Sequence, residues 1–128
     1  RRSSDLLADF CHKEIREWNA SLDLYNTELV SFQNRLAEVV KKNTGELVLK
    51  QVEHFQNQFV IHKDNIQTLQ HDIRIQEQDI AEDVRRDAIL EEKDIIGNQS
   101  FLRDKVHMAE KLWVSLRHDF YRFLASIL

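Results

Sequence analysis

The sequence contains no proline, only two glycines and a single cysteine among its 128 residues. Strands joined by tight turns need glycine or proline at short intervals, so the scarcity of both disfavours a β-sheet protein. The single cysteine, Cys11, excludes a disulfide within the chain and favours a reducing, cytoplasmic location. No run of about eighteen apolar residues occurs, so no membrane-spanning helix is predicted.

Charged residues are plentiful but unevenly distributed, and the net charge is −4. This acidic balance argues against nucleic acid as a partner, which requires a basic face, and against binding to a membrane surface. Residues 77–94 include eight acidic and three basic residues, whereas residues 103–122 include five basic and three acidic residues. The two segments can pair with each other or with a second copy of the chain, although a solvated helix surface is the simpler interpretation.

Apolar residues in the first third of the chain recur at alternating spacings of three and four. A seven-residue repeat of this kind places its apolar members in one stripe along a helix, which we call a seam. Residues 48–80 and 102–127 continue the pattern. We therefore predict an all-α fold, with residues 1–128 as one domain in which three long antiparallel helices form an up-down, coiled-coil-like bundle. The first seam contains Ile15, Trp18, Leu22, Tyr25, Leu29, Phe32, Leu36 and Val39.

Gly45 and Gly97 are the natural positions for breaks between the helices, because each interrupts the pattern within a polar phrase. The third helix so placed is much shorter than the second, which would leave one end of the bundle with two helices only. The predicted helices cover about residues 4–42, 46–95 and 99–128.

Two arrangements resolve this mismatch in helix length. The second helix can break within residues 81–94, where Asp83 and Asp87 take seam positions and the apolar residues shift to Val84 and Ala88. Alternatively, a second chain completes the bundle. We favour the second chain, and with it a homo-oligomer, preferably a dimer, because apolar residues outside the seams indicate further neighbours. Another helical protein is the alternative partner. The extra apolar residues are Leu6, Leu7, Phe10, Leu47, Ile61, Ile75, Phe101, Leu112, Leu124 and Leu128.

The motifs of common active sites are missing from the sequence. Two isolated glycines cannot form a phosphate-binding loop, one cysteine cannot form a cysteine-rich metal site, and no GxSxG segment occurs. Asp9-x-x-His12 and Asp104-x-x-His107 have a carboxylate-histidine spacing used by di-metal bundles, but these side chains lie away from or beside the seams. We predict no catalytic residue, no metal and no cofactor.

His62 and Gln76 occupy equivalent positions of the second seam, two repeats apart. A buried polar side chain costs free energy unless it is hydrogen-bonded, so each residue requires a compensating contact or a role. Three interpretations stay open: control of helix register, a pH-sensitive contact, and a ligand for a metal or a small molecule. We favour register control. The seam aromatics are predicted to pack the core, and they are Trp18, Tyr25, Phe32, Phe55, Phe59, Trp113 and Phe120.

Trp18 and Trp113, with the segment LWVSLRHDF around the second of them, resemble the first- and third-helix tryptophans of spectrin repeats. That resemblance implies a spacer or scaffold role, although spectrin repeats have helices of more equal length than those predicted here. The segments FQNRLAEVV and QVEHFQNQFVIHKDNI are similar to small uncharacterised helical proteins of bacteria, which implies no activity.

The sequence favours a non-catalytic protein–protein interaction or scaffold bundle over an enzyme. The alternative is a ligand- or metal-binding bundle in which His62 and nearby aromatic residues line an interior site. A third interpretation is a domain of a larger signalling or cytoskeletal protein.

Overall fold

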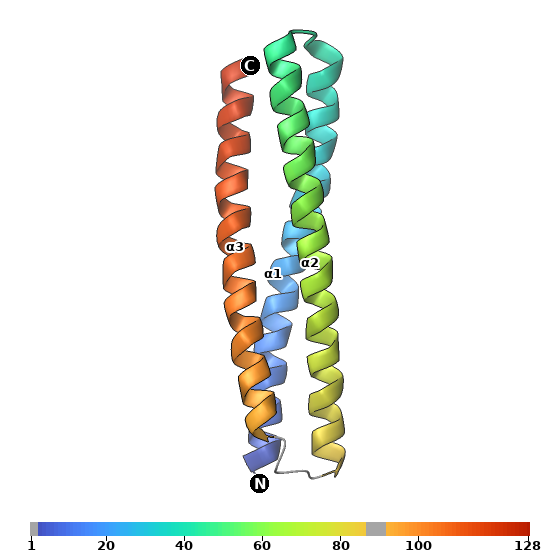
Figure 1. Ribbon diagram of the computed structural model, residues 1–128, viewed down its shortest axis with the longest axis vertical. Helices are drawn as coiled ribbons and strands as arrows, with labels where there is room; N and C mark the ends of the chain where they lie inside the picture. The colour runs from blue at the N-terminus through green and yellow to red at the C-terminus, as the bar shows by residue number, and fades with distance from the viewer. Residues whose placement is uncertain (1–2, 87–91) are drawn as a thin grey trace.

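The structure, a computed structural model, describes residues 3–86 and 92–128. The described residues form three helices and no strand: α1 (Ser3–Lys42), α2 (Glu46–Arg86) and α3 (Glu92–Ile127). Figure 1 shows the helices aligned along one long axis, with α1 and α3 running in the same direction and α2 in the opposite direction. The start of α1 lies beside the start of α3, and the end of α3 lies beside the α1–α2 connection. The predicted all-α bundle is confirmed.

The three helices are nearly equal in length, with 40, 41 and 36 residues. The end of α2 and the start of α3 differ from the main prediction. α2 ends at Arg86 instead of about residue 95, which falls within the segment 81–94 where a break is the alternative prediction. α3 begins at Glu92 instead of about residue 99. At 1.5 Å per residue, α3 spans about 54 Å and α1 about 60 Å. The mismatch in helix length is therefore absent, and it no longer argues for a second chain.

The second seam continues unshifted to the end of α2. Asp83 keeps the seam position and is 2% exposed, while Val84 is only half-buried. The predicted shift of the apolar residues toward Val84 is thus wrong within α2, and Asp87 and Ala88 lie outside the described residues. Asp83 Oδ1 has no hydrogen-bond partner in the described part of the chain.

Gly97 lies inside α3, so the predicted break at this residue is wrong. Glycine costs about 1 kcal/mol relative to alanine in a helix interior, which weakens a helix without ending it. The seam passes across the glycine, because Ile95 and Gln99 are buried on either side of it and Leu102 is buried one turn later. Burial of these side chains outweighs the low helix propensity of one glycine.

Each helix buries its seam against the other two helices. On α1 every predicted seam residue from Ile15 to Val39 is buried, and Ala8 and Cys11 extend the buried stripe toward the start of the helix. The seams of α2 and α3 contribute the larger part of the aromatic core. Their buried apolar members are Val52, Phe55, Phe59, Ile66, Leu69, Ile73, Ile80, Ile95, Leu102, Val106, Trp113, Leu116, Phe120 and Phe123.

Replacing Gly97 by alanine is expected to stabilise the protein, because nothing beyond the local helix backbone lies within 4 Å of a Cβ at this position. The expected gain in the free energy of unfolding is about 0.5–1 kcal/mol, measured by urea denaturation. Gly45→Ala is the matched control, and it should lower the free energy of unfolding. The Gly45 carbonyl accepts the Leu49 N–H at 3.0 Å and so occupies the cap of α2, where alanine is worse than glycine. A loss of stability in Gly97→Ala would contradict a continuous α3.

Candidate functional site

The aromatic seam residues meet in the half of the bundle nearer the α1–α2 connection. The ring centroid of Phe32 lies 5.5 Å from that of Trp113 and 5.0 Å from that of Phe120. Phe120 also lies 5.2 Å from Phe59, in an edge-on contact. Trp113, Phe59 and Phe120 are fully buried, and Trp18 is buried on α1 outside this cluster. These side chains pack against one another from all three helices.

Trp113 also connects the core with the outer edge between α1 and α3. Its indole N–H donates to Glu28 Oε1 at 3.2 Å, and Arg117 Nη1 donates to both Glu28 oxygens at 3.2 and 3.1 Å. The side chains of Arg117 and Glu28 are 33% and 22% exposed. A partly exposed ion pair contributes little to stability, so its main effect is to align α1 with α3 at the level of Trp113.

A polar layer crosses all three helices in the other half of the bundle. Gln76 Nε2 on α2 donates to Ile95 O and to Gln99 Oε1 on α3, each at 3.1 Å. Gln99 Nε2 donates onward to Glu14 Oε1 on α1 at 2.9 Å. Arg103 donates two further bonds to Glu14, at 2.6 and 2.8 Å. We call Gln76, Gln99, Glu14 and Arg103 the polar layer.

The polar layer holds an ionised carboxylate between α1 and α3. Hydrogen bonding from Arg103 lowers the pKa of the Glu14 carboxyl, burial opposes that effect, and the Gln99 bond reinforces it. Glu14 in turn raises the pKa of the Arg103 guanidinium. Cys11 lies next to the layer, with its carbonyl accepting from Gln99 at 3.4 Å. Burial, and then Glu14, raise the pKa of the Cys11 thiol, so the thiol stays protonated near neutral pH.

Gln76 has the interhelical hydrogen bonds that register control requires, but its partner Gln99 is missed by the sequence pattern. The reason is the assumed break at Gly97, which removes residue 99 from the third seam. The signal is present in the spacing, because Gln99 lies four residues after Ile95 and three before Leu102. Extending the seam backward through the glycine places Gln99 in the core.

The ion pairs of Glu14 and Glu28 with α3 are also missed, because their residues flank the seams instead of occupying them. Glu14 and Glu28 are fourteen residues apart on α1, and Arg103 and Arg117 are fourteen residues apart on α3. Each pair joins residues that differ by 89 in number, so both report the same alignment of the two helices. Equal spacing of acidic residues on one helix and basic residues on another is the signal that predicts them.

His62 lies inside the bundle against the aromatic cluster. Its side chain is 8% exposed, and its ring contacts Trp113 edge-on with the centroids 6.1 Å apart. Burial lowers the pKa of the imidazole, so the neutral form is favoured in the folded protein. The residue therefore packs as an aromatic side chain whose protonation opposes folding.

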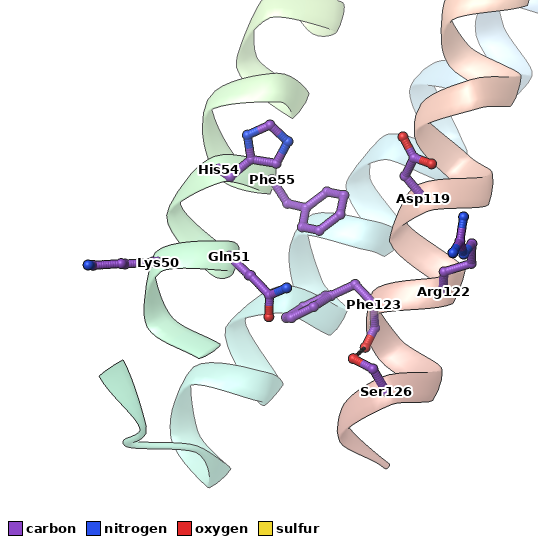
Figure 2. Close-up of a pocket in the computed structure, with 8 residues that line it drawn as sticks. All are labelled: Lys50, Gln51, His54, Phe55, Asp119, Arg122, Phe123 and Ser126. Atoms are coloured by element: carbon purple, nitrogen blue, oxygen red, sulfur yellow. Dashed lines mark hydrogen bonds between the residues drawn. The ribbon is translucent and has the colours of Figure 1, made fainter. Parts of the chain in front are cut away.

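Figure 2 shows a hollow between α2 and α3, with the rings of Phe55 and Phe123 between charged side chains. His54, Asp119 and Ser126 border it, which are the residue types of a hydrolytic triad. Ser126 Oγ instead donates to Phe123 O in its own helix at 2.6 Å. The described residues show no hydrogen bond that joins the three side chains, so they do not form a triad here.

The parts of the chain that the structure describes contain no group of three or more histidine, cysteine, aspartate or glutamate side chains placed to hold a metal ion. None of the three described helices is long and apolar enough to cross a membrane.

The outer edges between neighbouring helices differ in their chemistry. At the α1–α2 edge, Gln70 Nε2 donates to Asp23 Oδ1 at 2.9 Å and Asn26 Nδ2 donates to Gln70 Oε1 at 3.3 Å. At the α1–α3 edge lie the ion pairs of Glu14 and Glu28. The α2–α3 edge exposes large apolar side chains, each 43–59% exposed. We call this set the α2–α3 strip, and it consists of Ile61, Ile75, Phe101, Met108 and Leu112.

Comparison of the chain with protein-family models, with curated proteins and with solved structures gives no match. The nearly equal helix lengths remove one difference from spectrin repeats. The resemblances to spectrin repeats and to small bacterial helical proteins otherwise stay predictions.

Protonation of His62 is expected to destabilise the fold. The pKa of His62 is lower in the folded protein than in the unfolded chain, where it is about 6.5. The unfolded chain therefore binds the proton first, and the free energy of unfolding falls as pH drops below about 6.5. Chemical denaturation between pH 7.5 and 5 should show this loss, and His62→Leu should flatten it.

His71→Leu is the matched control for this experiment, because His71 is exposed on the same helix. It should retain the pH dependence of the wild type. An unchanged slope in His62→Leu would contradict the assignment of a neutral, buried imidazole.

Proposed function

We propose that the protein is a non-catalytic helical bundle that acts through contacts with other protein surfaces. The observation that carries this proposal is the α2–α3 strip, in which large apolar side chains are half-exposed along one edge. Grouped apolar side chains on a water-exposed surface are a feature of protein interaction sites. The α1–α2 and α1–α3 edges instead carry side-chain hydrogen bonds and ion pairs between helices, although Phe10, Leu24 and Ile96 are exposed apolar side chains outside the strip.

The polar seam residues support the same proposal, because both have structural roles. Gln76 is hydrogen-bonded within the polar layer, and His62 packs against Trp113. The ion pairs of Glu14 and Glu28 lie beside the seams, as in coiled-coil packing. A rigid bundle with a fixed outer surface suits a scaffold or interaction module.

We also propose a reducing, cytoplasmic location. Cys11 is a free thiol and is buried. Its raised pKa and its burial limit oxidation, so the residue is compatible with an interior packing role in such a compartment.

Site-specific photocrosslinking tests the interaction role. A photoreactive phenylalanine analogue at Phe101, within the strip, should form covalent adducts of discrete mass with a protein in the cells that produce this chain. The same analogue at Val30 is the control, since Val30 is similarly exposed, at 55%, but lies on α1 outside the strip. Absence of adducts at residue 101, or equal adducts at both positions, would overturn the proposal.

A further inference from the structure

The α2–α3 strip forms a continuous line along one face of the bundle. Ile75 and Phe101 border one hollow together, and Thr68 and Met108 border the next hollow along the same edge. Ile61 precedes Thr68 by seven residues and therefore lies on the same side of α2. The strip thus crosses both hollows and continues toward the α1–α2 connection.

One end of this face is acidic. Asp79 borders the hollow that also contains Phe101, and Asp72 borders both this hollow and the next one, which it shares with Lys105. Asp94 lies seven residues before Phe101 on the same side of α3, so it extends the acidic end. Lys105 partly offsets the negative charge of these three carboxylates, and its Nζ lies 4.6 Å from the centroid of the Phe101 ring.

The other end of the face is basic. Two cations, Lys50 and Arg122, border the hollow shown in Figure 2, together with His54 and one carboxylate, Asp119. Figure 2 places Lys50 and His54 on α2 and Arg122 on α3. The apolar strip therefore lies between an acidic end and a basic end of a single face.

A face with opposite charges at its two ends distinguishes between the two ways in which a second copy can pack on it. A two-fold axis parallel to the helices would place acidic end on acidic end. A two-fold axis that lies in the interface and is perpendicular to the helices would place each acidic end on a basic end. Like charges held opposite one another disfavour binding, so the charges select the second arrangement.

The residue spacings locate this axis. On α3, Asp94 and Arg122 lie fourteen residues before and after Met108, so they exchange places about a two-fold axis at Met108. On α2, Ile61 and Ile75 lie seven residues before and after Thr68. Because Thr68 and Met108 border the same hollow, a single two-fold axis can pass α2 at Thr68 and α3 at Met108.

We propose that the α2–α3 strip binds a second copy of this chain in the antiparallel, two-fold arrangement centred on Thr68 and Met108. In this dimer, each α2–α3 edge packs on the α2–α3 edge of the second copy with the helix directions reversed. Asp94 pairs with Arg122 of the second copy, and two-fold symmetry repeats the pair at the other end. The inference rests on the interaction role proposed above and names the partner.

Light scattering on a sizing column over a dilution series tests the dimer. The wild type should have the mass of a dimer that dissociates on dilution. Met108→Asp places two carboxylates at the axis and should raise the dimer Kd by about a hundredfold or more. Val30→Asp, the matched control on α1, should leave the Kd unchanged.

A charge exchange tests the antiparallel arrangement with variants that keep the strip intact. Asp94→Arg and Arg122→Asp should each raise the Kd by about tenfold, because each change affects two symmetric pairs. The double variant Asp94→Arg, Arg122→Asp should restore the wild-type Kd. Circular dichroism of every variant verifies the helical fold.

Three results would overturn the proposal: a monomeric wild type at every concentration, a dimer that Met108→Asp leaves intact, or a double charge variant as weak as the single ones. The interaction role is judged separately by the photocrosslinking experiment. A monomeric protein that crosslinks through residue 101 to a different protein would overturn the dimer and retain the interaction role.

Discussion

A buried side-chain amide that lacks a hydrogen-bond partner costs about 1–3 kcal/mol, and this constraint aligns the three helices. Apolar seams with a seven-residue repeat pack nearly as well when one helix slides by seven residues along another. Gln76 and Gln99 prevent this sliding, because the hydrogen bond between their side-chain amides forms only at one axial alignment of α2 and α3. Glu14 and Arg103 extend the same alignment to α1, and the Glu28–Arg117 pair repeats it fourteen residues further along both helices.

The outer contacts of the bundle differ between its three edges. Amide hydrogen bonds around Gln70 cover the α1–α2 edge, and ion pairs cover the α1–α3 edge. The α2–α3 edge has its glutamine contacts inside, at Gln76 and Gln99, and apolar side chains outside. The interior glutamines thus align α2 with α3 without occupying the outer surface of this edge, which exposes the α2–α3 strip.

The three helices and most of the core are predictable from the sequence, because a three-four apolar spacing sustained over several repeats matches the period of a helix and not that of a strand. The boundary between α2 and α3 is not predictable in this way. Polar residues, Asp83 and Gln99, occupy seam positions near it, and Gly97 has the sequence context of a helix break although it lies inside α3. The hydrogen-bond partners of Gln76 cannot be predicted from the seam of one helix either, because they depend on how two helices align along their axes. Spacing within one helix leaves that alignment free.

The most direct test of this alignment is a double-mutant cycle on Gln76 and Gln99, read as the free energy of unfolding. Gln76→Leu and Gln99→Leu should each cost about 1–3 kcal/mol, because the first leaves the buried Gln99 Oε1 without its donor, and the second removes the Gln99 hydrogen bonds to Gln76 and Glu14. The double variant should cost less than the sum of the two by about 1 kcal/mol or more. Additive effects, within about 0.5 kcal/mol, would show that the two amides do not interact and would contradict the alignment described for the helices.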